Sequence, residues 1–280
     1  MEVRIAENAG FCFGVKRAMK MAWDELENKN GDDVYSLGPL IHNKQAVDRY
    51  KEKGLVETDS LDKIPNDSKI IIRSHGVAEK IYTESKSKSM DIVDTTCPFV
   101  KKIHDIVKDF SDKGYKIIIV GNATHPEVIG INGWCNNEAI IINREEEIDN
   151  LSFNFDDKYC VVSQTTANLE LFDKIITKLE SKIKNLTVKN TICFATKERQ
   201  LSATDLAKEV DCMIVIGGKH SSNTQKLVNI CDNIVPTFSI ETKEELDRCK
   251  LEGFKVVGVT AGASTPDWII DEVIEYLKEI

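Results

Sequence analysis

The sequence predicts an α/β protein made of three similar units, each with a small, mainly parallel sheet. Short apolar runs of strand length alternate along the chain with longer amphipathic stretches of helix length. This alternation is typical of parallel sheets covered by helices. One order of a cysteine and two polar groups also recurs three times along the 280 residues. With 41% apolar residues, a chain of this length can bury a substantial core.

The expected strands are short apolar runs bounded by turn residues. They are Val34–Leu37, Lys69–Arg73, Lys116–Val120, Cys160–Ser163, Met213–Ile216 and Lys255–Val259, with Asp91–Asp94 and Leu186–Lys189 each closing a unit. The expected helices are Lys44–Lys53, Val100–Asp112, Leu169–Lys182, Lys197–Glu209 and Asp267–Ile280. No strand follows the last helix, so we expect Glu2–Ala6, at the other end of the chain, to pair into the third sheet.

Three cysteines share one local setting: NAGFCF at Cys12, DTTCPF at Cys97 and NTICFA at Cys193. Each of them opens a helix-like stretch. After each helix-like stretch comes a strand that ends in glycine. A polar residue lies four positions after that glycine; the pairs are Gly38 and His42, Gly121 and His125, Gly217 and Ser221. A second strand then ends in another polar motif, which contains His75, Thr166 or Ser264.

This repetition divides the chain into units 14–97, 98–192 and 193–280, with residues 1–13 joining the sheet of the third unit. In parallel α/β sheets the carboxyl ends of the strands line the binding crevice. We therefore expect the three cysteines and the six polar groups to converge on one cavity.

The composition excludes several classes of protein. The formal charge is −9 and no basic stripe is visible, which argues against nucleic-acid binding. The N-terminus lacks the features of a signal peptide, and the longest apolar runs are too short to span a bilayer. We expect a cytoplasmic protein. A small anionic ligand stays possible, because local donors rather than net charge would hold it.

The cysteines fall into two groups. Those outside the repeat are expected to be structural thiols: Cys160 and Cys212 in strands, Cys231 and Cys249 in or beside helices, and Cys135 in a loop. Three thiolates can hold zinc or an iron–sulfur cluster. Paired zinc spacing and a local ferredoxin run are both absent, and one ligand per unit suits a cluster at a domain junction. With three cysteines, one iron of a [4Fe–4S] cluster would keep an open site.

The polar groups favour a phosphate ligand. Strand ends and helix N-termini supply donors, and GGKHSSN at residues 217–223 has the composition of an anion-binding loop. There is no P-loop and no GxGxxG, so a nucleotide is not indicated. His104 and His220 fall outside the repeat and are expected to be structural.

The chain resembles the 4-hydroxy-3-methylbut-2-enyl diphosphate reductase (IspH/LytB) family. The matching motifs run in order from Gly10 to Pro266, nearly the whole chain. They are GFCFGV at 10–15, HN at 42–43, SHG at 74–76, TCP at 96–98, HPEV at 125–128, QTT at 164–166, CFAT and RQ within 193–200, SSN at 221–223 and TAGAS-x-P at 260–266.

The resemblance implies a trefoil of three α/β domains around a [4Fe–4S] cluster held by Cys12, Cys97 and Cys193. It implies a reductive dehydroxylation that yields isopentenyl and dimethylallyl diphosphate, with a ferredoxin or flavodoxin as electron donor. Glu127 would supply protons, and Thr166 would hydrogen-bond near the substrate hydroxyl. We expect the Thr166 hydroxyl to relay the proton from Glu127 to the substrate oxygen. The diphosphate would be held by His42, His75, His125, Ser221, Ser222, Asn223 and Ser264.

Two other classes of function also fit a three-cysteine cluster. A hydratase with an open iron would turn over without any reductant. An iron or oxygen sensor would need no substrate pocket, and the repeated polar groups count against it.

Overall fold

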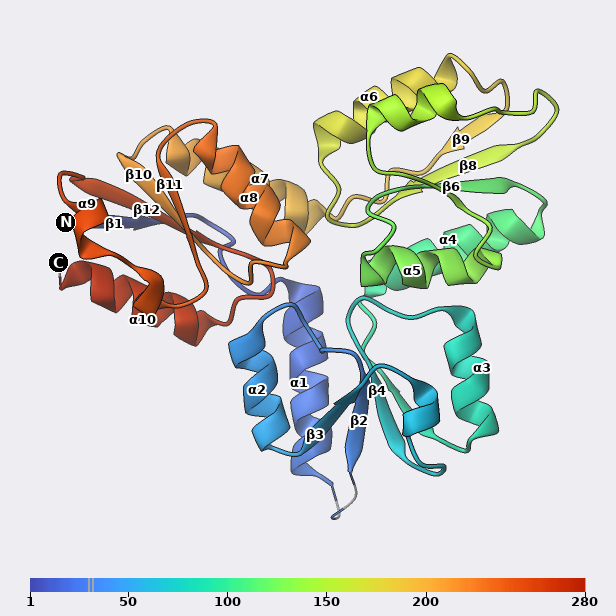
Figure 1. The fold of residues 1–280 in the computed structure, drawn as a ribbon, viewed down its shortest axis with the longest axis horizontal. Coiled ribbons are helices and arrows are strands. Elements are labelled where there is room, and N and C mark those ends of the chain that lie inside the picture. The colour runs from blue at the N-terminus through green and yellow to red at the C-terminus, as the bar shows by residue number, and fades with distance from the viewer. Residues whose placement is uncertain (30, 32, 280) are drawn as a thin grey trace. The chain divides into compact units, whose positions relative to one another are not determined.

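The computed structural model describes residues 1–29, 31 and 33–279, and these form three separate four-stranded sheets (Figure 1). All described strand pairs are parallel, which confirms the predicted α/β class with three small parallel sheets. In spatial order the strands of the first sheet are β3 (Leu55–Thr58), β2 (Val34–Leu37), β4 (Lys69–Ile72) and β5 (Asp91–Asp94). Those of the second are β7 (Ile140–Ile142), β6 (Lys116–Val120), β8 (Tyr159–Ser163) and β9 (Leu186–Val188). Those of the third are β11 (Thr237–Ile240), β10 (Cys212–Ile216), β12 (Val256–Ala261) and β1 (Glu2–Ile5).

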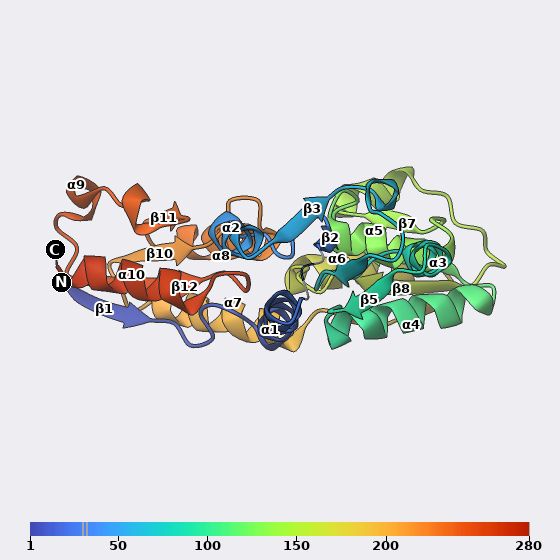
Figure 2. The same cartoon turned by 90° about the horizontal axis from the view of Figure 1, so that it is seen from below.

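The three sheets share one strand order. If the strands of each of the first two sheets are numbered 1 to 4 along the chain, their spatial order from one edge is 2-1-3-4. The third sheet repeats this order, but its fourth position is filled by β1 from the other end of the sequence. Glu2 pairs with Val256 and Ile5 with Val259. Figure 2 shows β1 beside β12, so the N-terminal strand lies in the third sheet.

Helices connect the strands, as parallel pairing requires. They are α1 (Phe13–Glu27), α2 (Lys44–Glu52), α3 (Glu79–Ser87), α4 (Pro98–Asp112), α5 (Pro126–Asn132), α6 (Leu169–Glu180), α7 (Phe194–Ala207), α8 (Ser222–Asp232), α9 (Arg248–Leu251) and α10 (Asp267–Lys278). No helix in the described part of the chain is long and apolar enough to cross a bilayer.

Helices cover both faces of the third sheet (Figure 1). On one face, α10 packs Ile269, Val273 and Leu277 against β10 and β12. On the other, α7 and α8 bury Ala203 and Leu227 against Met213 and Val215 of β10. The second sheet is covered in the same way, by α6 on one face and by α4 and α5 on the other. Burial of the central strands on both faces explains their nearly continuous hydrophobic runs in the sequence.

The described contacts group the chain into two compact units. The terminal unit comprises Met1–Lys16, Ile41–Glu52 and Phe194–Ile280, and it holds the third sheet. The central unit comprises Arg17–Leu40 and Lys53–Cys193, and it holds the first and second sheets. As the repeating units of the fold we propose residues 14–97, 98–192 and 193–280, with 1–13 completing the third.

Several local expectations need correction. Cys135 was expected in a loop, but it ends the 3₁₀ turn Gly133–Cys135 and is buried, because α5 continues directly into that turn. The helix expected at Lys197–Glu209 begins at Phe194 and ends at Ala207. Ile280 and the side chain of Cys249 lie outside the described part of the structure.

Candidate active site

Cys12, Cys97 and Cys193 occupy equivalent places, each directly before a helix. Helices α1, α4 and α7 begin at Phe13, Pro98 and Phe194, so each thiol lies at the positive end of a helix dipole. All three cysteines are half-buried. The buried cysteines differ: burial raises the pKa of the thiols of Cys135, Cys160, Cys212 and Cys231 to about 11. Those four stay protonated near neutral pH, as expected for structural thiols.

The backbone ties each of these three cysteines to one of the predicted polar motifs. The Cys12 N–H donates to the Ala263 carbonyl at 3.3 Å, within TAGAS. The Cys97 N–H donates to the Ser74 carbonyl at 3.0 Å, within RSHG, and the Cys193 N–H to the Thr165 carbonyl at 2.9 Å, within SQTT. In each case the acceptor follows the third strand of a sheet. The threefold sequence repeat is therefore also a repeat of local geometry.

In the terminal unit, the N-terminus of α8 holds three predicted ligand-binding residues, Ser221, Ser222 and Asn223, and the unit also contains His42 and Ser264. Ser221 caps α8, its hydroxyl accepting from the Thr224 N–H at 3.3 Å, and Ser222 is the first helical residue. The Ser264 hydroxyl donates to the His42 carbonyl at 3.4 Å. The same carbonyl lies only 2.4 Å from where a Cβ on Gly218 would stand, so only glycine fits there.

Asn223 carries the clearest indication that the loop at residues 217–223 binds a ligand. The residue is 4% exposed, yet neither the oxygen nor the nitrogen of its side-chain amide has a hydrogen-bond partner among the residues that the structure describes. Leaving such a group unpaired is costly. A helix N-terminus with an unpaired buried amide and two serine hydroxyls is suited to bind a phosphate group.

In the central unit, His75 and His125 face each other. Their rings are 5.5 Å apart between centroids and meet edge to face at 77°. His125 also caps α5, because its Nδ1 accepts the Glu127 N–H at 3.2 Å. In a neutral imidazole this leaves Nε2 as the N–H donor.

Glu127 is 2% exposed and held by Thr165. The Thr165 N–H donates to Oε1 at 2.5 Å, and the Thr165 hydroxyl donates to Oε2 at 2.7 Å. Thr166, the residue expected from the sequence, accepts at its hydroxyl from the Gln164 amide at 2.9 Å. The QTT motif indicated two hydroxyls, but the sequence alone did not show which one reaches Glu127, so Thr165 was missed.

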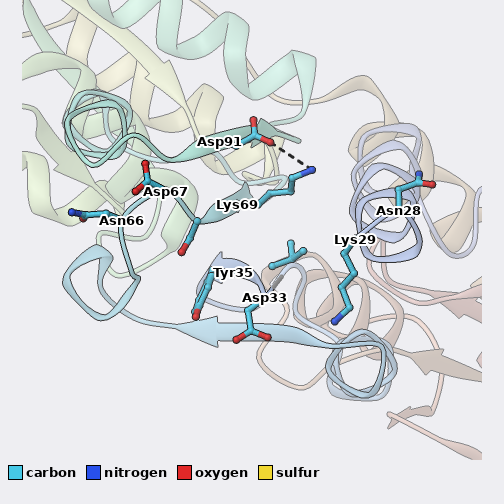
Figure 3. Close-up of a pocket in the computed structure, with 10 residues that line it drawn as sticks. Asn28, Lys29, Asp33, Tyr35, Asn66, Asp67, Lys69 and Asp91 are labelled. Atoms are coloured by element: carbon cyan, nitrogen blue, oxygen red, sulfur yellow. Dashed lines mark ion pairs between the residues drawn. The ribbon is translucent and has the colours of Figure 1, made fainter. Parts of the chain in front are cut away.

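A polar hollow of about 430 Å³ in the central unit lies elsewhere (Figure 3). It opens at the amino ends of β2, β4 and β5, where Lys69 and Asp91 form an ion pair at 3.5 Å. The predicted site residues follow the carboxyl ends of strands. This hollow lies at the opposite edge of its sheet and contains none of them.

The repeated strand order and the cysteine tied to each strand-end motif define a threefold-repeated α/β protein with one half-buried thiol per repeat. The chain matches the LytB protein family over residues 3–278, and it belongs to that family.

Its relatives are similar over their full length. The 4-hydroxy-3-methylbut-2-enyl diphosphate reductase of Clostridioides difficile (strain 630) is 61% identical, and that of Alkaliphilus oremlandii (strain OhILAs) is 49% identical; both alignments cover 100% of each chain. A solved (E)-4-hydroxy-3-methyl-but-2-enyl diphosphate reductase, described as the terminal enzyme of the non-mevalonate pathway, is 42% identical with a TM-score of 0.74, covering 100% of both chains. The E-1-hydroxy-2-methyl-but-2-enyl-4-diphosphate reductase of Plasmodium falciparum is 27% identical with a TM-score of 0.92, covering 99% of this chain and 87% of that one.

Proposed function

We propose that the chain catalyses the reductive dehydroxylation of 4-hydroxy-3-methylbut-2-enyl diphosphate to isopentenyl and dimethylallyl diphosphate, the final step of the non-mevalonate isoprenoid pathway. Two electrons and two protons enter, the allylic C–O bond breaks, and water leaves. The names of full-length relatives support this activity. The single observation that carries it is Thr165, which hydrogen-bonds the buried acid Glu127 and also the backbone of Cys193.

The three half-buried cysteines fit an iron–sulfur cluster by their chemistry. Cys12, Cys97 and Cys193 are thiols at helix N-termini, where the dipole stabilises anionic ligands, and each backbone amide is fixed by a hydrogen bond. We assign them as the ligands of a [4Fe–4S] cluster with one open iron. When bound, such a cluster supplies electrons and a Lewis-acidic site for a substrate oxygen.

The proposed diphosphate ligands offer hydrogen-bond donors. In the terminal unit, Asn223 offers its buried amide and Ser221, Ser222 and Ser264 offer hydroxyls beside His42. In the central unit, His75 and His125 offer imidazole N–H groups. Charge-assisted hydrogen bonds of this kind are stronger than neutral ones.

Glu127 is the proton source in this proposal. A protonated Glu127 would donate to the Thr165 hydroxyl, which would pass its own proton to the departing hydroxide of the substrate. The second hydrogen bond, from the Thr165 N–H, holds the carboxyl group in place through this exchange. Thr166 stays a proposed contact of the substrate hydroxyl.

Electrons would come from a reduced ferredoxin or flavodoxin. The test is an anaerobic assay of the reconstituted protein with a reduced donor and the hydroxymethylbutenyl diphosphate, followed by product analysis. Both isoprenyl diphosphates should form only when reductant is present. Turnover without reductant would indicate a hydratase, and the absence of both turnover and substrate binding would favour a sensor.

A further inference from the structure

We propose that Arg199 is a positioning residue that holds the Cys12 loop in its ligating conformation. The inference rests on the proposed role of the three cysteines as cluster ligands. Arg199 lies on α7, six residues after Cys193, and the residue is 2% exposed. A guanidinium buried to this degree must have partners that fix it in one geometry.

The guanidinium group of Arg199 hydrogen-bonds the loop immediately before Cys12. Nε donates to the Asn8 carbonyl at 2.8 Å and Nη2 donates to the Gly10 carbonyl at 2.9 Å. Nη1 donates to the Ala195 carbonyl at 3.4 Å, within its own helix. Two parallel bonds from one planar group fix both the position and the orientation of the two carbonyls.

The loop before Cys12 has two residues with positive φ, a conformation that surrounding contacts must stabilise. Asn8 and Gly10 both lie in the left-handed region, with φ of 63° and 91°. A Cβ on Gly10 would stand 2.8 Å from the Ile270 side chain, so the loop is also tightly enclosed. Non-glycine residues in the left-handed region persist where surrounding contacts hold them.

The other side of the loop is bound to β12 and the chain that follows it. The N–H groups of Ala6, Gly10 and Cys12 donate to the carbonyls of Val259, Ala261 and Ala263 at 2.8, 3.3 and 3.3 Å. Between Ala6 and Gly10 the loop bulges away from this ladder, and the Asn8 carbonyl in the bulge is one of those that Arg199 binds. The N–H ladder and the guanidinium fork together leave the Cys12 backbone little freedom.

In the central unit, a second arginine hydrogen-bonds the backbone just before a proposed cluster ligand. Arg17 lies on α1, five residues after Cys12, and its Nη1 donates to the Thr96 carbonyl at 3.3 Å. Thr96 directly precedes Cys97. In both cases an arginine on the helix that follows one cysteine binds a carbonyl just before another cysteine. The single, longer bond of Arg17 predicts a weaker effect than that of Arg199.

The test uses lysine, which keeps the positive charge but cannot make two parallel bonds. The wild-type chain, Arg199→Lys and Arg17→Lys are reconstituted anaerobically with iron and sulfide. Cluster loss to an iron chelator is then followed by visible absorption, and thermal unfolding by circular dichroism. Arg144→Lys, an exposed arginine paired with Glu147, is the charge-matched control. Ala203→Gly, buried on the same helix α7, is the stability-matched control.

Arg199→Lys should lose its cluster about 10 to 100 times faster than the wild type, the usual scale for groups that orient metal ligands. Arg17→Lys should show a smaller increase, and Arg144→Lys none. A wild-type rate of loss in folded Arg199→Lys would overturn the proposal. So would equally fast loss from Ala203→Gly at the same melting temperature, because the effect would then be one of general stability. If Arg199→Lys does not fold, the test rests on Arg17→Lys. A wild-type rate of cluster loss in Arg17→Lys would then overturn the proposal that these arginines position the cysteines. Failure of the wild-type chain to bind any cluster would instead refute the proposed function.

Discussion

Thr165 holds the buried carboxylate of Glu127 with its own N–H and hydroxyl, at 2.5 and 2.7 Å. The carbonyl of the same threonine accepts the N–H of Cys193 at 2.9 Å. One residue therefore fixes both a buried acid and the backbone of a proposed cluster ligand. This relationship links proton supply to electron supply in the proposed reaction, and the kinetic effects expected at Glu127 and Thr165 follow from it.

Replacement of Glu127 by glutamine should lower turnover by roughly 10²-fold or more, the scale of general acid catalysis. Glutamine keeps the volume of the side chain. Its amide oxygen can accept from the Thr165 N–H and its amide NH2 can donate to the Thr165 hydroxyl, but it cannot supply an acidic proton. Iron content and substrate affinity should stay near wild-type levels. Steady-state kinetics with a saturating electron donor are the measurement, and near-normal turnover would reduce Glu127 to the stabilising first-turn acid of α5.

The two adjacent threonines should differ in effect. Thr165→Val removes the hydroxyl bound to Glu127 while keeping the shape, so kcat should fall by at least about tenfold. Thr165→Ser should restore most of the rate. Thr166→Val is the matched control, and its kinetic effect should appear mainly in KM if this hydroxyl contacts the substrate. A larger fall in kcat for Thr166→Val than for Thr165→Val would assign the proton relay to Thr166.

Asn223→Ala should weaken substrate binding with little change in kcat. A hydrogen bond to a charged group contributes about 1.5–3 kcal/mol, so KM should rise by about 10- to 100-fold. Asn229→Ala, at an exposed position on the same helix, is the control and should leave KM unchanged. Titration with substrate under non-reducing conditions gives the affinity directly. An unchanged affinity in Asn223→Ala would remove this loop from the diphosphate site.

His104 should make stability pH-dependent in mild acid. Burial lowers the pKa of His104 from 6.5 to about 4, with Lys101 lowering it further and Asp94 raising it. Below pH 6.5 the unfolded chain binds a proton that the folded chain excludes, so the free energy of unfolding falls as the pH drops from 6.5 to 4. The loss over this window is about 3 kcal/mol.

The comparison is with His104→Phe, which keeps a ring to stack on Trp134, 5.0 Å away in the native chain. Urea unfolding at several pH values between 6.5 and 4 gives the slope for each protein. In His104→Phe the free energy of unfolding should fall less steeply as the pH drops from 6.5 to 4, because the protonation of His104 in the unfolded chain no longer contributes. Equal slopes in the two proteins would mean that His104 titrates normally in the folded state.

Most of the fold could be predicted because its signals are local. The central strands β4, β6, β8, β10 and β12 are nearly all apolar, and the structure confirms them within a few residues. The edge strands β3, β7 and β11 were missed because they are short and only partly buried and, unlike the equally short β5 and β9, do not lie just before a repeated cysteine. Helix α8 was missed because it opens with Ser222, Asn223 and Thr224, which favour turns and caps over helix interiors.

The candidate site was predictable in its residue types but not in its contacts. The threefold repeat identified each cysteine and each strand-end motif. It could not choose between Thr165 and Thr166, because adjacent residues point in different directions and only the folded chain shows which one meets Glu127. Arg199 was also outside prediction, because its partners Asn8 and Gly10 lie 191 and 189 positions away along the chain.

The most direct test of the central claim is an electron count during a single anaerobic turnover. The reconstituted chain is mixed with a limiting amount of reduced donor and excess hydroxymethylbutenyl diphosphate, and the oxidised donor and the products are quantified together. The proposed reaction predicts two electrons consumed for each molecule of isopentenyl or dimethylallyl diphosphate formed, and no product without donor. Product formation with no donor oxidised would contradict a reductase.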